Sequence, residues 1–525
     1  MTAIMTDQSP PNVAKLVNDL MANNNASDED SEAVLHQLKT YLASVNSSQM
    51  ETIVREVNVT EICQQLNNAE NNANTDVIAG VFDIVFETLS AQYILNNLHK
   101  DIVNGLDAKN DAFVELWLRT LDRSLTHELA LNHTLNTEID VHLVLIKVIR
   151  LFAKQQTSIA KHCRSIVLNI AKSNTLGDKF FEKDIHELLV VTKSVSDIVQ
   201  MRVYDILVAI ASTSHTNFYK VEGFGHLANL LTDFNVCSKT DPLLTLNILQ
   251  ILTDLGATTF GNDYLQSSEI LKTIVRCLDT SDSDIFANLL IPGYVKIVAT
   301  LAASDPKILA KYPSVLTKLK ALLTDVDPSL VFCAIDGIAV MCYRNTGKEM
   351  VDKNNDISKV FMSTINNFLT NGSTEHKMRA LNGLSNLLKL NESDYNSDLS
   401  TNFSYKWFQL FSPNDNKILV LLHIAKEPFI ELRLAAMECI RVVTTFSWGQ
   451  KELAATAGFL EYLLDRSTET TKHGKEAKYS IVKQLVGSPF ISESFTKEAV
   501  IQLRAFYKEG PYYMGNDTAV SFEAV

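Results

Sequence analysis

The stretch Ile248-Leu249-Gln250-Ile251-Leu252-Thr253-Asp254-Leu255 decides the fold of this chain. Its residues Ile248, Ile251, Leu252 and Leu255 follow the spacing i, i+3, i+4 and i+7, which places them on one face of an α-helix. The same spacing of core-type residues recurs along the chain. The copies start at Ile78, Val114, Leu145, Val203, Ile248, Val295, Ile335, Leu381 and Cys439.

Successive copies are separated by 36, 31, 58, 45, 47, 40, 46 and 58 residues. Most of these spacings lie near the period of roughly 40–47 residues that armadillo and HEAT arrays have. A single repeat cannot bury its apolar face alone, so neighbouring repeats must stack. We therefore predict an all-α fold, a right-handed superhelical solenoid of the armadillo/HEAT type with about nine to eleven repeats. Such a fold is typical of scaffolds that bind other proteins.

Composition agrees with a long helical array. The chain has 525 residues, too many for one compact core, and only 18 glycines and 11 prolines. Its formal net charge of −14 disfavours nucleic acid and anionic membranes as partners. The seven cysteines form no Cys-x-x-Cys pair, which favours buried thiols in a reducing compartment. We find neither a secretory signal nor an apolar run of about 18 residues, and we expect a monomer in the cytoplasm, with the nucleus as the alternative.

The chain divides into three parts by composition. Residues 1–30 are polar and are predicted to be mostly disordered, residues 31–513 form the repeat array, and residues 514–525 form a disordered tail. A stretch rich in Asn, Ser and Asp, residues 391–416, predicts a loop insertion in which Tyr405–Phe411 docks back as a short helix. Gly223 and Gly458 are predicted to open the second long helix of their repeats, and Pro292 predicts a kink or a late helix start.

The sequence contains no complete motif for catalysis among those it partly matches. Gly223 to Ala228 matches G-x-G-x-x-A, but no strand pattern precedes it as a dinucleotide site requires. His127-Glu128 and His186-Glu187 lack the second histidine four residues after the first that a zinc protease needs. We therefore expect no enzymatic activity, no cofactor and no metal.

The outward face of the repeated helices is the candidate binding surface. Positions +1, +5 and +9 of each copy point away from the apolar positions, and in armadillo arrays that face of the last helix lines a concave groove. Basic residues gather on the early copies, within an acidic chain. A solvated helix face and a surface that meets an acidic partner both fit this pattern. The candidate partner-binding residues, which stand at these positions or, as Lys147 does, near them, are Arg119, Arg123, Lys147, Arg150, Lys296, Asp336, Asn382 and Asn386.

Several segments, in this order and spacing, resemble the proteasome 26S non-ATPase regulatory subunit 5 family. The resembling segments are Arg202-Val203-Tyr204-Asp205-Ile206-Leu207, Pro292-Gly293-Tyr294-Val295-Lys296, Lys311-Tyr312-Pro313, Gly458-Phe459-Leu460-Glu461-Tyr462, Asp465-Arg466-Ser467, Lys475-Glu476-Ala477-Lys478-Tyr479, Val482-Lys483 and Glu509-Gly510-Pro511-Tyr512-Tyr513. They span roughly residues 140–513, and the first hundred or so residues match poorly.

The resemblance implies an armadillo/HEAT fold and a role as assembly chaperone for the base of the 26S proteasome regulatory particle. It implies binding to the C-terminal domain of an AAA ATPase subunit and release before the mature proteasome forms. The implied partners are regulatory subunit 7, with regulatory subunit 4, and non-ATPase subunit 2. The resemblance brings no catalytic residues with it.

A general armadillo scaffold and a nuclear-import adaptor are the alternatives. Adaptors that hold basic peptides need a ladder of groove Trp and Asn residues. This chain has three tryptophans, and Trp117 occupies an apolar position of its helix. Only Asn386 stands in the expected Asn place, which disfavours the adaptor.

Overall fold

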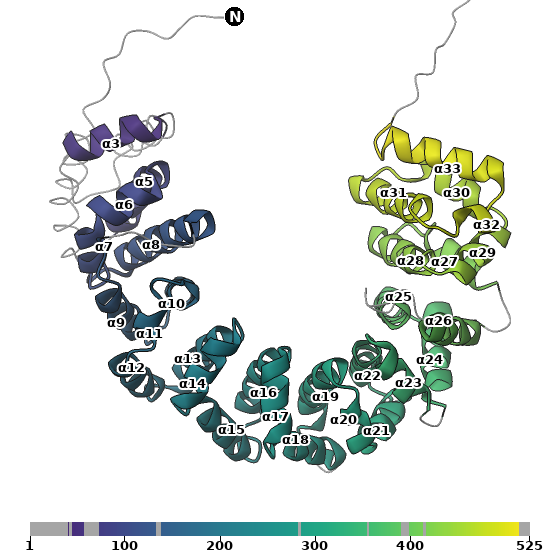
Figure 1. Ribbon diagram of the computed structural model, residues 1–525, viewed down its shortest axis with the longest axis horizontal. Coiled ribbons are helices and arrows are strands. Elements are labelled where there is room, and N and C mark those ends of the chain that lie inside the picture. The colour runs from purple at the N-terminus through teal and green to yellow at the C-terminus, as the bar shows by residue number, and fades with distance from the viewer. Residues whose placement is uncertain are drawn as a thin grey trace, which may run out of the picture. The chain divides into compact units, whose positions relative to one another are not determined.

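The computed structural model describes residue 40 and residues 45–56, 73–132, 138–281, 285–353, 356–389, 398–412 and 416–513. Within these ranges every regular element is a helix, as the sequence predicts (Figure 1). The chain divides into two compact units, residues 1–237 and 238–525. The predicted polar segment 1–30 and the predicted tail 514–525 lie outside the described residues.

In unit 1, four helices pack side by side as a row. The row consists of α5 (Ala73–Thr88), α8 (Asp111–Asn132), α10 (Thr157–Lys172) and α13 (Asp197–Ala211). Shorter helices form a second layer along it. They are α6 (Ala91–Asn97), α7 (His99–Gly105), α9 (Val141–Leu151), α11 (Gly177–Phe180), α12 (Lys183–Lys193), α14 (His215–Gly223) and α15 (His226–Cys237), and α3 (Ser47–Glu56) precedes α5.

Unit 2 repeats this arrangement with six helices in its row (Figure 1). The row consists of α16 (Pro242–Gly256), α19 (Ala287–Ser304), α22 (Pro328–Met341), α25 (Thr374–Leu388), α28 (Ile430–Val443) and α31 (Lys472–Val486). Its second layer holds α17 (Thr259–Ser267), α18 (Ile270–Asp279), α20 (Lys307–Lys311), α21 (Ser314–Leu322), α23 (Asn345–Asp352), α24 (Ile357–Asn371), α26 (Asp398–Leu410), α27 (Lys417–Ile424), α29 (Ser447–Ala455), α30 (Phe459–Leu464), α32 (Ile491–Ser494) and α33 (Lys497–Glu509).

The apolar spacing found in the sequence builds these rows. In the copy that starts at Ile248, the side chains of Ile248, Ile251, Leu252 and Leu255 are all buried in α16. The helix begins where the sequence allows it, because Pro242 at the first position needs no hydrogen-bond partner for its nitrogen. The side chain of Asp241 accepts a hydrogen bond from the amide of Leu244 and so caps the helix.

One of the nine copies does not lie in a row. The copy that starts at Leu145 belongs to α9, in the second layer of unit 1. The row helix between α8 and α13 is α10 instead, where Cys163, Ile166, Val167 and Ile170 have the same spacing and are buried. The prediction that the helix starting its apolar pattern at Leu145 belongs to the row is therefore wrong for this repeat. Both helices are amphipathic, so apolar spacing alone does not distinguish the two layers.

The row of unit 2 also contains a copy that the sequence pattern missed. In α31 the apolar residues Ile481, Val482 and Leu485 stand at i+3, i+4 and i+7, and position i is Lys478. That lysine is buried, with 2 % of its surface exposed. A search for apolar residues passes over this helix because one of its four core positions carries a charge.

Three local predictions need correction. Helix α19 begins at Ala287 and continues through Pro292, so the late start predicted at that proline is wrong. Most of the predicted loop 391–416 that the structure describes is helix α26, which begins at Asp398 rather than at Tyr405. Gly223 ends α14, and Gly225, with a φ of 77°, precedes the next helix. Gly458, with a φ of 79°, does open its helix, α30, as predicted.

Helix α19 has the length and mean hydropathy of a membrane span. Half of its 18 residues are buried in the protein, where the helix packs between α16 and α22 of the row. This burial is typical of the core helix of a helical array.

Candidate functional site

The predicted groove residues of unit 2 lie on neighbouring helices of its row. Lys296 is on α19, Asp336 is on α22, and Asn382 and Asn386 are on α25, and all four are exposed. The structure therefore brings these residues to successive helices, as the spacing predicts. Their role in binding a partner stays a prediction.

Two of these residues are joined to neighbouring row helices by polar contacts. The Lys296 ammonium donates a hydrogen bond of 2.6 Å to Oε1 of Gln250 on α16. The Arg379 guanidinium on α25 lies 3.4 Å from the carboxylate of Asp336. Partial burial raises the pKa of Asp336, and the charge of Arg379 lowers it in part. The sequence pattern missed both partners, because each stands about one repeat away along the chain.

A hollow of about 350 Å³ opens between α19 and α22 next to these contacts. Pro292, Val295 and Val340 provide apolar walls, and Lys296 and Asp336 also line it. Such a hollow, with 43 % of Val340 exposed, can accept one apolar side chain of a protein partner between two charged groups. The helical spacing predicted the charged residues of this surface and placed its apolar ones in the core.

The basic residues of unit 1 are less available than the sequence suggests. Arg119 and Arg123 lie on α8, where they form ion pairs of 3.1 Å with Asp83 and Glu87 of α5. Each pair joins adjacent row helices at the protein surface, where such pairs contribute about 0–1 kcal/mol. The charge of these two arginines is thus largely neutralised within the protein.

Lys147 and Arg150 do not continue the line of the α8 arginines. They lie on α9 in the second layer, so the single groove predicted across all four residues is wrong for this pair. Lys147 forms an ion pair with Asp107. Arg150 is exposed, and within the described part of the chain no ion pair is recorded for it. Arg150 is therefore the candidate most able to meet an acidic partner.

The tryptophans do not line a groove. Trp117 and Trp407 are fully buried, with 1 % and 0 % of their surfaces exposed. Trp448 is half-buried in an aromatic cluster and stacks at 5.0 Å on the ring of Phe446. The described tryptophans therefore serve packing, and they give the peptide-adaptor alternative no support.

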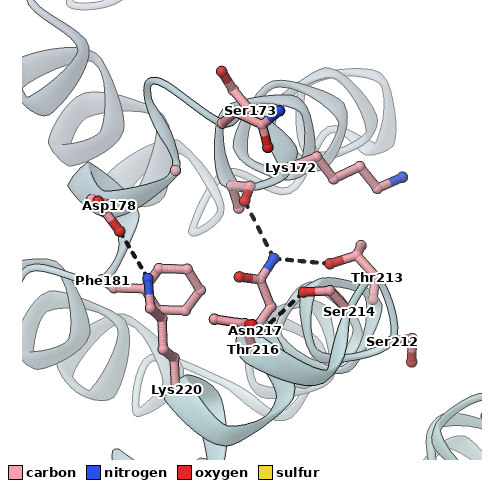
Figure 2. Close-up of a pocket in the computed structure, with 14 residues that line it drawn as sticks. Lys172, Ser173, Asp178, Phe181, Ser212, Thr213, Ser214, Thr216, Asn217 and Lys220 are labelled. Atoms are coloured by element: carbon pink, nitrogen blue, oxygen red, sulfur yellow. Dashed lines mark hydrogen bonds and ion pairs between the residues drawn. The ribbon is translucent and has the colours of Figure 1, made fainter. Parts of the chain in front are cut away.

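A hollow of about 670 Å³ lies between α10–α11 and α13–α14 in unit 1. Figure 2 shows that its polar groups bond to one another across it. The Asn217 amide donates hydrogen bonds to the carbonyl oxygen of Ala171 at 3.4 Å and to Oγ1 of Thr213 at 2.9 Å. The Lys220 ammonium contacts Asp178 at 2.8 Å. These contacts identify the hollow as a junction between adjacent repeats.

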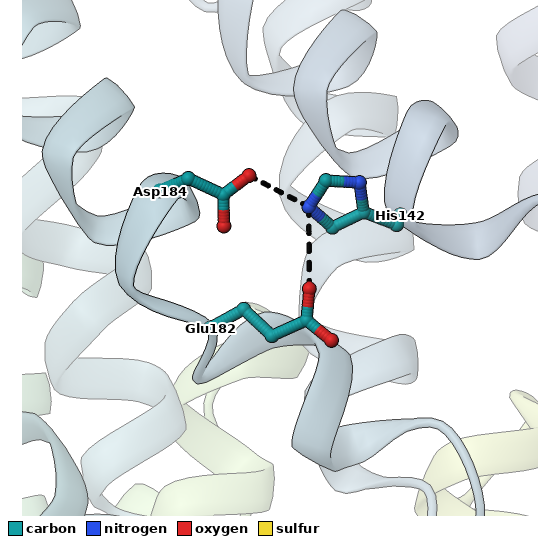
Figure 3. Close-up of side chains that lie close together, drawn as sticks. All are labelled: His142, Glu182 and Asp184. Atoms are coloured by element: carbon teal, nitrogen blue, oxygen red, sulfur yellow. Dashed lines mark hydrogen bonds and ion pairs between the residues drawn. The ribbon is translucent and has the colours of Figure 1, made fainter.

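A histidine and two carboxylates meet where α9 and α12 begin (Figure 3). His142 Nε2 lies 2.8 Å from Asp184 Oδ2 and 3.3 Å from Glu182 Oε2. Imidazole and carboxylates can bind zinc. Here, however, Lys179 already contacts Glu182 at 2.8 Å, and two positive helix N-termini lie beside the group. Both features disfavour a bound cation, and the group joins the two helices.

A histidine pair is buried in the second layer of unit 1. His186 Nδ1 lies 2.9 Å from His226 Nε2, so one ring must donate the hydrogen and the other must accept it. The His186 ring also stacks on Phe224, with 3.6 Å between ring centroids. Burial, with the charge of His226, lowers the pKa of His186 to about 3. Burial, with the charge of Lys193, lowers the pKa of His226 to about 4.

We expect unit 1 to lose stability as the pH falls below about 6.5, because the unfolded histidines bind protons there and the folded ones do not. Each of His186 and His226 should lower the free energy of unfolding by about 1.4 kcal/mol per pH unit between pH 6 and pH 4.5. Urea unfolding at several pH values, followed by a signal that reports on the unfolding of unit 1, measures this slope. The variant with both His186→Leu and His226→Leu should show a smaller slope, and an unchanged slope would contradict the assignment.

The sequence profile of the family described as Proteasome non-ATPase 26S subunit matches residues 13–525. This chain belongs to that family. The 26S proteasome non-ATPase regulatory subunit 5 of Bos taurus is 27% identical over 482 residues, which cover 91% of this chain and 93% of the relative. The Homo sapiens protein of the same name is 26% identical over 449 residues, 85% and 87% of the two chains. The resemblance found in the sequence is thus confirmed.

Solved structures resemble this proteasome-family chain in fold alone. Yeast importin-β (Kap95p) superposes with a TM-score of 0.61 at 14% identity, over 94% of this chain. The chain spans only 61% of that importin. Importin-β crystallised in a polyethylene glycol condition gives a TM-score of 0.61 at 13% identity, over 93% of this chain and 63% of the importin. The likeness confirms a helical solenoid.

Family-like segments of this chain serve to fasten its repeats. The guanidinium of Arg202 donates hydrogen bonds to the carbonyl oxygens of Phe152 and Lys154, at 3.0 and 2.6 Å, and so satisfies the end of α9. Arg466 does the same for the end of α33, where it contacts the carbonyl oxygen of Gly510 at 2.6 Å. Two of the resembling segments, those of Arg202 and Arg466, therefore supply contacts that hold neighbouring repeats together.

Proposed function

We propose that this chain is an assembly chaperone for the base of the 26S proteasome regulatory particle. It binds the C-terminal domain of an AAA ATPase subunit and leaves before the mature proteasome forms. The family membership over residues 13–525 carries this proposal. The relatives at 26–27% identity bear the name of a proteasome regulatory subunit, which supports a proteasome component as the client.

The fold fits a binding role, and we infer that the chain acts by binding and not as an enzyme. A solenoid row offers an extended surface on which a small domain can lie. In unit 2 that surface includes the hollow beside Lys296 and Asp336. We infer that the client is regulatory subunit 7, with regulatory subunit 4 and non-ATPase subunit 2 as further partners, and that the chain acts in the cytoplasm or the nucleus.

Release follows from the size of the chaperone. A solenoid of this length, held on the C-terminal domain of one ATPase, occupies space that neighbouring subunits or the proteolytic core need. Completion of the particle then removes the chaperone by competition for the same surface. No nucleotide hydrolysis by the chaperone itself is required.

The direct test is gentle purification of the tagged full-length chain and identification of its partners by mass spectrometry. We expect ATPase subunits of the base without subunits of the proteolytic core. Stable recovery of complete, capped proteasomes in ATP would contradict release before maturation. Recovery of importins or cytoskeletal proteins in place of ATPases would replace the proposal with a general scaffold.

Charge reversal tests whether unit 1 takes part in client binding. We expect the variant R119E/R150E to bind the C-terminal domain of regulatory subunit 7 several-fold more weakly at moderate salt, mainly through slower association. Fluorescence anisotropy or stopped flow measures this. The control K100E/K183E makes the same charge change at two exposed lysines elsewhere in the unit. Equal binding by both variants would mean that Arg119 and Arg150 take no part in client binding and are solvated or structural side chains.

A further inference from the structure

Tyrosines gather on α31, on α33 and in the segment that follows α33 (for the two helices see Figure 1, yellow end). Tyr507, Tyr512 and Tyr513 have 37 %, 50 % and 48 % of their surfaces exposed. Tyr479 of α31 stacks on Tyr507 of α33, with 5.6 Å between ring centroids and 11° between planes. We name these four residues, with Arg504 and Lys508 of α33, the C-terminal tyrosine surface. Adjacent exposed aromatic rings that polar residues surround are typical of interaction sites.

The rings of the C-terminal tyrosine surface are held in place by polar contacts. The Tyr512 hydroxyl donates a hydrogen bond of 2.5 Å to Oε1 of Glu476 on α31. The Tyr479 hydroxyl donates one of 3.2 Å to the carbonyl oxygen of Tyr507. Tyrosines that are fixed before binding lose little conformational entropy on binding, which is why they serve as anchors at protein interfaces.

Arg466 fastens the segment that carries Tyr512 and Tyr513. Its guanidinium lies 3.8 Å from the centre of the Phe506 ring and 5.5 Å from that of Tyr513. It also forms an ion pair of 3.1 Å with Glu509. The backbone after α33 is therefore tied to unit 2 from two sides, by α31 and by the turn that contains Arg466.

The stretch of chain that carries the rings has a net charge opposite in sign to that of the whole chain. Residues 472–513 contain seven Lys or Arg and four Asp or Glu, a net charge of +3, whereas the whole chain carries −14. Glu476 and Glu509 are already engaged by Tyr512 and Arg466. Arg504 and Lys508 are exposed on α33, and among the described residues no ion pair is recorded for either. An approaching carboxylate would therefore meet cations whose charge is not neutralised.

We propose that the C-terminal tyrosine surface binds an acidic protein segment that also carries apolar side chains. Arg504 and Lys508 receive its carboxylates, and the tyrosine rings receive its apolar side chains. The acidity of the whole chain disfavours RNA as the occupant, although bases also stack on aromatic rings. The inference rests on the geometry and charge of this surface and does not depend on the proposed client.

The test uses a defined probe, a fluorescein-labelled peptide that repeats Glu-Leu-Asp-Phe three times, and the full-length chain. Fluorescence anisotropy should show saturable binding that weakens as salt is raised. The variant R504E/K508E should bind at least tenfold more weakly, and Y513S several-fold more weakly. Far-UV circular dichroism and the unfolding midpoint check that both variants are folded. The control K272E/K359E makes the same charge change at exposed lysines elsewhere in unit 2 and should bind as the unchanged chain does.

Any of four outcomes would overturn the proposal. The first is equal binding of the peptide by R504E/K508E and by K272E/K359E. The second is equal binding of a peptide in which lysine replaces each acidic residue, and the third is preferential binding of single-stranded oligouridine. The fourth is binding that appears only after residues 514–525 are removed, because the chain itself would then occupy the surface.

Discussion

Replacing Glu469 with glutamine is expected to destabilise unit 2 by about 3–5 kcal/mol, the usual effect of breaking a buried ion pair. Only 2 % of the Glu469 surface is exposed, and the carboxylate lies 3.3 Å from Nε of Arg433 on α28. Its charge also acts on buried Lys478, whose pKa burial lowers to about 8 while Glu469 raises it in part. Without the carboxylate, Arg433 loses its ion-pair partner, and Lys478 loses the stronger of the two negative charges, those of Glu469 and Asp465, that act on it.

The contacts of the buried Lys478 side chain show how this cluster stabilises unit 2. The ammonium donates hydrogen bonds to the carbonyl oxygens of Tyr462 and Asp465, at 2.5 and 2.9 Å, and lies 3.9 Å from the centre of the Tyr462 ring. The cluster therefore fastens the end of α30 to α31. Hydrogen exchange of α30 and α31 should rise in E469Q more than that of α16 and α19, if the loss is local.

Urea unfolding of E469Q and of the unchanged chain measures the effect. The matched control is E498Q, which removes an exposed carboxylate from α33 in the same unit and should change the free energy of unfolding by less than about 0.5 kcal/mol. A loss below about 1 kcal/mol in E469Q would mean that water or a rearranged Arg433 replaces the ion pair, and the buried cluster would then matter little for stability.

The sequence predicted the rows because burial repeats with the helical period. It failed where the pattern was ambiguous or broken. Leu145 and Cys163 start equally good apolar stripes, and only packing decides that α10, and not α9, stands between α8 and α13. Lys478 occupies a core position because three oxygen acceptors and a ring surround it, and none of these is visible from the spacing within one helix.

The binding face shows the same limit. The helical period placed Lys296 and Asp336 on the exposed face, and the structure agrees. It did not reveal that Asp83 neutralises Arg119, because the two residues stand one repeat apart and meet only when the helices pack. A search for opposite charges at the repeat spacing would have found this pair and the pair of Arg123 with Glu87.

Replacing Gly347 with alanine should destabilise unit 2 by about 3 kcal/mol, the upper part of the range for overpacking a core. A Cβ atom at this position would lie 2.0 Å from the backbone carbonyl oxygen of Met341, the last residue of α22. Glycine lets the short helix α23 approach the carbonyl end of the row helix. Backbone on both sides must move to admit a methyl group, and side-chain rotation offers no relief.

The sign of this effect separates packing from helix propensity. Alanine is the better helix former by about 1 kcal/mol, so propensity alone predicts that G347A is stabilising. Gly223 is the matched control, because it ends α14 and a Cβ there meets no atom within 4 Å. G223A should leave the unfolding free energy unchanged or raise it by up to about 1 kcal/mol, measured by urea unfolding.

The same close approach of a glycine to a carbonyl oxygen recurs at other helix junctions of unit 2, so the prediction extends to other repeats. Cβ atoms on Gly261 and Gly449 would each lie 2.1 Å from a carbonyl oxygen six residues earlier, that of Leu255 and that of Val443. G261A and G449A should therefore destabilise unit 2 about as much as G347A. If G347A alone is destabilising, the contact at Met341 is a local accident. If all three variants are destabilised, the glycine is a general feature of the repeat. It stands six residues after a carbonyl oxygen near the end of a row helix and lets the next helix pack against that oxygen.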